Sequence, residues 1–413
     1  MTTHAHALPG GSATSASVVP DNDAWVHEAL RGQFRGWSCS RVHFAYPLDT
    51  RRSYLVELPQ HVLSALEERE EIQFKGAQAS TGAVLCTHER TYALQFRENS
   101  NALFLLDQSA SASLENGARE PPALSLPIRM AMHGSVELTH TAPHVRPLRD
   151  LLAPHILKSG DGLRQPSNES SSSSADGLGI EWSIIEEQVL ASAAEIRSTL
   201  KELCAVERNS GVWIRLDPDL VLETLSLLFD TIILQQWCSA AFPRDELESE
   251  MAKDCAHELV RAVVGLFCTP SERHTGWEQW DRDRLLRFSG EHLLEQRCST
   301  SPDEELDFMS AWGKLLPDDV KPELGTLRGL FVMDRTRLKY TPYWRLSIEP
   351  AMRFSQLFAL QSSWSRSEIE PFLKDLCGEN EGHLDQMLRR HAKLVHGLGG
   401  QNYVARAPVI PFR

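Results

Sequence analysis

The chain has 413 residues, of which 42% are hydrophobic and 24% are charged. This length predicts two to four domains with packed cores, because single cores rarely grow beyond about 250–300 residues, and the composition excludes a wholly disordered protein. The formal net charge of −14 argues against a protein that binds nucleic acid over its whole surface.

The eight cysteines are scattered, and the closest pair, Cys255 and Cys268, is 13 positions apart. The sequence contains no C-x-x-C, so neither a zinc ribbon nor a thioredoxin-like redox motif is expected. It also has no run of 18 apolar residues and no apolar signal region near its first residue. We therefore expect a soluble intracellular protein with no membrane partner.

Residues 1–45 begin with a small, polar, Gly- and Pro-punctuated stretch and are expected to be mostly disordered. Residues 46–158 are predicted to form a β-rich domain with one short helix near 59–71. Its strands are too few to close a barrel, and an open sheet edge favours aggregation unless a partner covers it. The predicted strands are 54–58, 72–76, 83–86, 91–96, 102–106 and 130–138, with turns at 87–89 and 98–101.

Residues 159–179 contain Gly, Pro, Asn and a run of five serines, and they are predicted to form a flexible linker. After the linker, apolar residues recur at helical spacing. Residues 212–216 then alternate as a strand, and Asp217 with Pro218 caps and opens the next helix. A helix, a turn, a second helix and a β segment, in this order, are expected of a winged-helix domain.

We predict three winged-helix units in tandem, at residues 180–241, 242–300 and 301–380, followed by a basic C-terminal tail at 381–413. In the third unit, a helix at 324–330 precedes a hairpin formed by 330–333 and 338–348. Residues 334–413 hold 12 Lys and Arg against 8 Asp and Glu, so this end is mildly basic while the rest is acidic. Such a distribution permits a local nucleic-acid contact.

Three blocks of sequence carry a family resemblance. The last, residues 364–377, opens with a capping box of Ser365 and Glu368, and Pro371 follows inside the predicted helix. The others are residues 83–106 and 328–335. In this order the blocks resemble the Dcc family of sister chromatid cohesion proteins, over residues 54–380. The matching details are Cys86, Thr91-Tyr92 with Leu94, Ser100-Asn101, Gly329-Leu330, Asp334-Arg335, and Trp364 through Cys377.

The resemblance implies a non-catalytic adaptor subunit of the alternative, chromosome-transmission-fidelity clamp loader, which resembles replication factor C. In that family the β domain shares a composite barrel with the smallest loader-associated subunit and the C-terminal tail of the large subunit. An array of winged-helix domains follows, in which the first contacts the leading-strand polymerase and the later ones contact single- or double-stranded DNA. The implied role is sliding-clamp loading and unloading, with only indirect clamp contact, and sister chromatid cohesion during DNA replication in the nucleus.

Basic residues near aromatic ones are the candidates for DNA contact, because they suit phosphates and unstacked bases. The alternative is that the aromatic residues Tyr340, Tyr343 and Trp344 are core and that only the basic ends reach solvent. The candidates for DNA contact are Arg335, Arg337, Lys339, Arg345, Arg389, Arg390 and Lys393. The candidates for a partner interface are Tyr92, Leu94, Phe96, Leu103, Leu105 and Trp213, of which Trp213 is also a natural core residue.

Catalytic motifs are incomplete in this sequence. His257-Glu258 lacks the second histidine of H-E-x-x-H, and Gly313-Lys314 lacks the other residues of a P-loop. We therefore predict no catalytic residue, no metal and no cofactor, with ATP hydrolysis in partner subunits. One alternative is a winged-helix transcription or signalling-complex protein that self-associates, and another is an enzyme with a diffuse active site.

Overall fold

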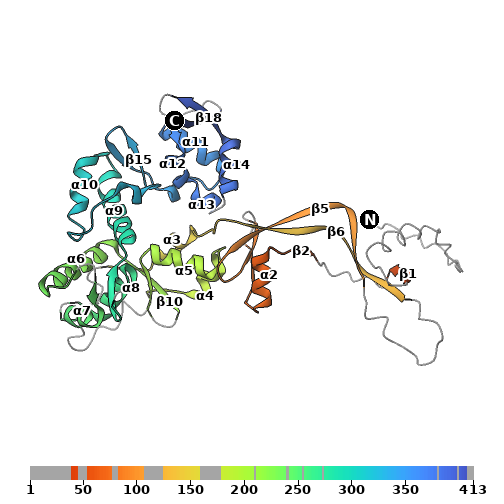
Figure 1. The fold of residues 1–413 in the computed structure, drawn as a ribbon, viewed down its shortest axis with the longest axis horizontal. Coiled ribbons are helices and arrows are strands. Elements are labelled where there is room, and N and C mark those ends of the chain that lie inside the picture. The colour runs from red at the N-terminus through yellow and green to blue at the C-terminus, as the bar shows by residue number, and fades with distance from the viewer. Residues whose placement is uncertain are drawn as a thin grey trace, which may run out of the picture. The chain divides into compact units, whose positions relative to one another are not determined.

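The computed structural model describes residues 39–44, 54–76, 82–106, 124–158, 178–208, 211–238, 241–253, 255–271, 274–378, 381–397 and 400–406. Its architecture is mixed α+β, as predicted, with a half-barrel sheet followed by small α/β repeats (Figure 1). The predicted linker at 159–179 and most of the predicted N-terminal segment at 1–45 lie outside the described residues. Within the described ranges, no helix combines the length and apolar character needed to cross a membrane.

Contacts divide the chain into two compact units. The first comprises Met1–Leu55 with Arg97–Ser135, and the second comprises Val56–Phe96 with Val136–Arg413. Two long strands, β5 (Thr91–Leu106) and β6 (Leu124–His140), contribute residues to both units.

The N-terminal sheet has six strands in the order β1-β6-β5-β4-β3, with β2 paired to β6. Strand β1 runs parallel to β6, whereas β3 pairs antiparallel with β4 and β4 antiparallel with β5. Among the described strands β1 and β3 end the path without pairing to each other, so the sheet is open. The bounds of the other strands are β1 Cys39–Phe44, β2 Leu55–Glu57, β3 Gln73–Gly76 and β4 Ala83–Cys86.

The turn predicted at residues 98–101 is wrong, because β5 runs unbroken from Thr91 to Leu106. The polar sequence there resembles a turn, but β5 is hydrogen-bonded to β6, which satisfies its backbone in an extended conformation. The helix predicted near 59–71 is confirmed as α2 (Gln60–Glu67). It buries Val62 against Leu85 and Tyr92 in a small core.

The rest of the second unit contains four successive repeats of a similar element order: helix, short strand, helical segments and a hairpin (Figure 1). Two helical segments precede the hairpin in the first three repeats, and four precede it in the last. In each repeat the short strand pairs with the last strand, which gives a three-stranded antiparallel arrangement. In the first repeat, β7 (Ile156–Leu157) adds parallel to the last strand.

The first repeat comprises α3 (Pro147–Leu152), β8 (Ile180–Glu181), α4 (Trp182–Gln188), α5 (Ala193–Glu202), β9 (Ala205–Glu207) and β10 (Val212–Leu216). The second comprises α6 (Pro218–Leu234), β11 (Phe242–Pro243), α7 (Arg244–Met251), α8 (His257–Phe267), β12 (Cys268–Pro270) and β13 (Trp277–Trp280). The third comprises α9 (Arg282–Cys298), β14 (Asp303–Glu304), α10 (Glu305–Gly313), the 3-10 helix η2 (Leu324–Leu327), β15 (Phe331–Asp334) and β16 (Arg337–Tyr340), and η3 (Tyr343–Arg345) follows it. The fourth comprises α11 (Pro350–Leu360), β17 (Ser363–Ser365), α12 (Arg366–Ile369), η4 (Glu370–Phe372), α13 (Lys374–Cys377), α14 (Glu381–His391), β18 (Ala392–Gly397) and β19 (Gly400–Ala405).

Apolar helix faces build the cores of these repeats. Helix α3 buries Leu148 and Leu152 against α4 and α5, so it belongs to the core of the first repeat. The second and third repeats share one large core that includes Trp280 and Trp312. The fourth repeat has its own core around Phe354 and Trp364.

The region predicted as a basic tail contains α14 and the hairpin β18–β19. Strand β19 pairs with β17, and α14 buries Leu384, Met387 and Leu388 in the core of the fourth repeat. Figure 1 shows α14 and β18 beside α11 and α12 in the blue part of the chain. The described residues of 381–406 are therefore folded onto 350–378.

The capping box predicted at Ser365 and Glu368 is confirmed, with the carboxylate accepting from the Ser365 backbone at 2.8 Å. The apolar face that follows is also buried. It forms α12, η4 and α13 rather than one helix, because Pro371 has no backbone N–H to donate and its ring crowds the preceding turn.

Candidate functional site

The hairpin β15–β16 carries three of the predicted DNA contacts. Along β16, Leu338 and Tyr340 are buried whereas Arg337 and Lys339 are exposed, as strand alternation requires. Arg335 occupies the turn with a φ of 56°, in the left-handed region. The hairpin therefore presents a short row of cations on the face opposite the core.

The basic side chains in and near this hairpin differ in the ion pairs and hydrogen bonds that they already form. Arg337 pairs with Glu304 at 3.1 Å and donates to the Pro302 carbonyl at 3.0 Å. Arg345 lies beyond the hairpin in η3 and pairs with Glu295 at 2.8 Å. Among the described residues, the side chains of Arg335 and Lys339 form no ion pair or hydrogen bond. These two are the cations most readily available to a phosphate.

The aromatic residues near the hairpin pack inward. Tyr340 is buried, and burial raises the pKa of its hydroxyl. The Trp344 ring lies edge-on to Tyr343, with ring centroids 5.1 Å apart, and Arg149 covers it at 3.7 Å from the ring centroid. Of the two alternatives weighed from the sequence, this arrangement matches packed aromatic residues with basic side chains reaching solvent.

A second basic group lies where α14 meets β18. Arg389, Arg390 and Lys393 are exposed there, the first two in the last helical turn. Cations at a helix C-terminus are favourable in themselves because they oppose the helix dipole. Burial, with Arg390 and Arg406 nearby, lowers the pKa of His391, whose ring stacks on Phe354 at 5.2 Å. His391 is therefore neutral near pH 7 and adds no charge to this group.

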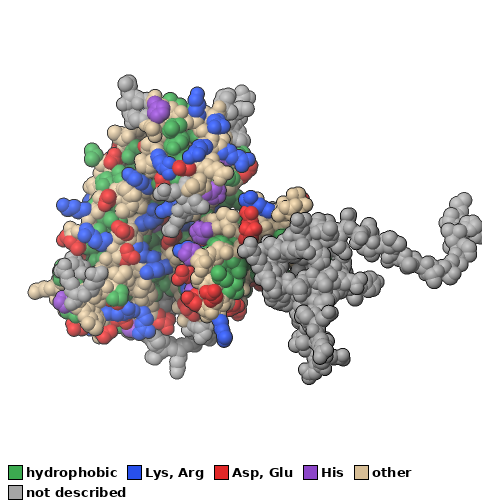
Figure 2. Space-filling view, turned by 45° about the vertical axis from the view of Figure 1, so that its right-hand side comes forward, with side chains coloured by type: hydrophobic (Ala, Val, Ile, Leu, Met, Phe, Trp, Pro, Cys, Tyr) green, Lys and Arg blue, Asp and Glu red, His purple; other side chains and the backbone are tan. Residues whose placement is uncertain are grey.

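Figure 2 shows basic side chains interspersed with acidic ones over the visible face rather than one continuous basic surface. Any nucleic-acid contact is therefore confined to small groups of residues, in accordance with the acidic net charge.

The predicted partner-interface residues fall into three classes. Tyr92 and Leu94 pack in the small core under α2, and Tyr92 also meets the His140 ring edge-on. Trp213 is half-buried beside Trp182 in the first repeat. Phe96, Leu103 and Leu105, in contrast, are exposed along β5.

Sequence reasoning missed several further exposed apolar residues of the same region. Phe74 on the end strand β3 is 66% exposed, and Leu63 and Leu66 on α2 are also exposed. The signal was present for α2, since Leu66 follows Val62 by four residues and widens the apolar face that Val62 and Ala65 bury.

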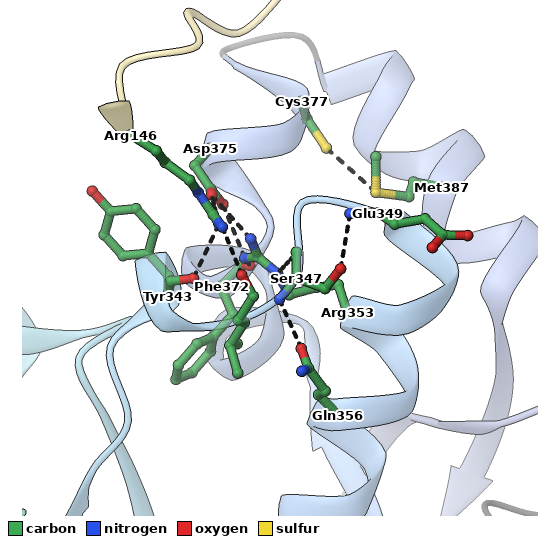
Figure 3. Close-up of polar contacts among 11 residues, drawn as sticks. Arg146, Tyr343, Ser347, Glu349, Arg353, Gln356, Phe372, Asp375, Cys377 and Met387 are labelled. Carbon is green, nitrogen blue, oxygen red and sulfur yellow. Dashed lines mark hydrogen bonds and ion pairs between the residues drawn. The ribbon is translucent and has the colours of Figure 1, made fainter. Parts of the chain in front are cut away.

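A buried carboxylate cluster joins the first repeat to the fourth (Figure 3). Arg353 of α11, fully buried, donates to Asp375 at 3.0 and 3.1 Å and to the Ser347 carbonyl at 2.6 Å. Arg146, immediately before α3, donates to the same carboxylate at 2.6 Å and to the Leu346 carbonyl at 2.6 Å. Burial lowers the pKa of Arg353, and Asp375 opposes that shift. The cluster holds the first repeat against the fourth.

Two of the sequence blocks that carried the family resemblance contact each other. Gly329 has a φ of 84°, and a Cβ there would lie 3.0 Å from the Pro371 carbonyl oxygen. The adjoining Leu330 and Trp364 are both buried. The close approach and the positive φ both favour glycine at position 329.

Comparison with known proteins gives consistent matches. A family model described as "Sister chromatid cohesion protein Dcc1" matches residues 53–373. The chain is similar to the sister chromatid cohesion protein DCC1 of Xenopus tropicalis, 23% identical over 363 residues, and to that of Danio rerio, 24% identical over 374 residues; each match covers 86% of this chain and 89% of the relative. The Homo sapiens DCC1 is 22% identical over 361 residues, with 86% of this chain and 88% of the relative covered.

Proposed function

The chain belongs to the Dcc1 family of sister chromatid cohesion proteins, and from this premise we propose that it is a non-catalytic adaptor subunit of an alternative clamp loader. Membership of this family implies a place in a cohesion-related complex. The proposed complex contains the large and small subunits of a loader that resembles replication factor C. ATP hydrolysis would reside in those partners, and the site of action would be chromatin at the replication fork in the nucleus.

The observation that carries this proposal is the exposed apolar surface on an open sheet. Leu103 and Leu105 lie two apart on β5 and thus on one face, with 37% and 53% of their surfaces exposed. Open strands with apolar side chains favour association. Strands from the small subunit and from the C-terminal tail of the large subunit would complete the barrel.

We further propose that the four repeats are winged-helix domains. The support is their shared order of elements, in which a hairpin follows the helical segments and the short strand pairs with its last strand. In this reading β15–β16 and β18–β19 are wings. Arg335 with Lys339, and Arg389 with Arg390 and Lys393, would contact DNA phosphates weakly and with strong salt dependence.

We propose that the first repeat and the completed barrel together contact the leading-strand polymerase. The half-buried Trp213 would support this surface from beneath rather than insert into the polymerase. The sliding clamp would be reached only through the other loader subunits. Sister chromatid cohesion would follow from clamp loading and unloading at the fork.

A double variant tests the proposed partner interface. In Leu103→Asp/Leu105→Asp, two charges replace apolar residues on the β5 face, and we expect the loader subunits to be lost from affinity-purified complexes. The matched control is Leu306→Asp on α10, because Leu306 is also exposed but lies outside the sheet. Retention of the partners by the double variant, or their equal loss from the control, would contradict this interface.

A further inference from the structure

A cavity of about 320 Å³ lies where the first three repeats meet. Its wall includes Arg149 of α3, Arg215 of β10, and Arg284 and Arg287 of α9. Pro218, at the start of α6, lines it as well. Four arginines from three elements, α3, β10 and α9, therefore line one cavity.

The cavity has more basic than acidic groups. Arg345 also lines it, and the facing carboxylates are Glu202, Glu291 and Glu295, so five arginines meet three glutamates. His292 at the rim contacts Asp219 at 3.0 Å. Glu295 is already held by Arg345 at 2.8 Å, and burial raises the pKa of Glu291. The cavity therefore keeps an excess of positive charge that the protein does not neutralise.

The carboxylates that act on these arginines, such as Glu291 on Arg149 and Asp281 on Arg284, do so from a distance. Among the described residues, none of Arg149, Arg215, Arg284 and Arg287 forms an ion pair. Arg287 donates to the Thr326 carbonyl at 2.8 Å, and Arg284 donates to the Lys201 carbonyl. The Nε atoms of Arg215 and Arg284 are buried without a hydrogen-bond partner. Burying guanidinium groups without counter-charges is unfavourable, and burial lowers the pKa of Arg149 and Arg284.

We propose that this cavity binds a compact phosphate anion, either inorganic phosphate or pyrophosphate or the phosphate group of a small ester, between Arg149, Arg215, Arg284 and Arg287. Phosphate carries multiple charge and accepts hydrogen bonds in the geometry that guanidinium groups offer. A stacked nucleic-acid base fits less well, because Arg149 already covers the face of Trp344. The anion would join α3 and β10 of the first repeat to α9 of the third.

Titration of the full chain with pyrophosphate tests the site directly, by isothermal calorimetry and by the melting temperature at constant ionic strength. We expect saturable 1:1 binding and a melting temperature that rises with pyrophosphate concentration. Parallel titrations with inorganic phosphate and with ADP distinguish a free anion from an ester. Absence of saturable binding for all three ligands would overturn the proposal.

Three variants locate the binding. Arg284→Gln should weaken affinity at least tenfold, whereas Arg282→Gln on the same helix should leave it unchanged, because Arg282 is exposed and does not line the cavity. Glu202→Gln removes a competing carboxylate at the rim and should strengthen binding severalfold, an effect that a loss of structure cannot mimic. Equal affinities for Arg284→Gln and Arg282→Gln, or weaker binding by Glu202→Gln, would place the anion elsewhere and overturn the assignment.

Discussion

Arg335 combines backbone strain with a functional role at one residue. Its φ of 56° lies in a region where side chains other than glycine are disfavoured, and asparagine or glycine would suit the turn better. A bulky cation at this position of the hairpin β15–β16 is therefore not explained by local folding preference. Contact with a DNA phosphate would explain the arginine, and DNA binding can be measured separately from the stability of the fold.

Arg335→Gly should accordingly lower DNA affinity while leaving stability nearly unchanged. Relief of strain and the added freedom of the unfolded chain nearly cancel, so the free energy of unfolding should change by less than about 1 kcal/mol. DNA affinity should fall, and the slope of log affinity against log salt should decrease by about 0.9 for one lost phosphate contact. Arg335→Lys is the control that keeps the charge, and an unchanged salt slope in Arg335→Gly would remove this residue from the interface.

In the Arg146–Asp375–Arg353 cluster, we expect a single group, the Asp375 carboxylate, to matter for stability. Asp375→Asn would leave both Arg353, which is buried, and Arg146 without a charged partner in the cluster, with backbone carbonyls among their remaining acceptors. Breaking a buried ion pair in this way should cost about 3 kcal/mol of unfolding free energy. The measurement is chemical denaturation, with tryptophan fluorescence as the signal of unfolding.

Asp385→Asn serves as the matched control for that change. Asp385 pairs with Arg366 at 2.7 Å, but both side chains are substantially exposed. We expect a cost below about 1 kcal/mol there. Equal costs for the two variants would mean that the Asp375 cluster does not hold the array together.

At the scale of elements, the packing of β15–β16 on the fourth repeat depends on Gly329. Ala at this position would be strained by the φ of 84° and would press on Pro371. We expect Gly329→Ala to lower the free energy of unfolding by about 1–3 kcal/mol. Gly265→Ala, inside α8 with open space around it, should instead raise stability by about 0.4–1 kcal/mol. A calorimetric melt that showed the same sign for both would contradict this packing.

Elements set by local chemistry were predictable from the sequence. The capping box at Ser365, the strand at 212–216 and the Asp217 cap before Pro218 all occur as expected. Each depends on residues a few positions apart. The alternation along β16 likewise separated its buried and exposed residues correctly.

Elements set by distant partners were not predictable in the same way. The polar residues 98–101 remain in β5 because β6 pairs with that strand. Helix α14 and β19 find their partners in α11 and β17, across the boundary predicted at 380. The contact between Arg146 and Asp375 spans 229 positions and has no local signature. The arginine cavity is hidden from sequence for the same reason, since three repeats contribute its wall.

At the scale of the whole molecule, an open sheet is followed along the chain by four packed repeats. The four repeats bury their aromatic residues in cores. Strand β5 keeps Leu103 and Leu105 exposed. We propose that assembly with other chains is centred on this strand.

Size-exclusion chromatography with light scattering tests the central claim, using the full chain expressed alone and with the large and small loader subunits. We expect the chain alone to form no stable homodimer, and the three chains together to form a monodisperse 1:1:1 complex. A stable homodimer of the chain alone that excludes both subunits would contradict the account and would favour the self-associating transcription-type protein.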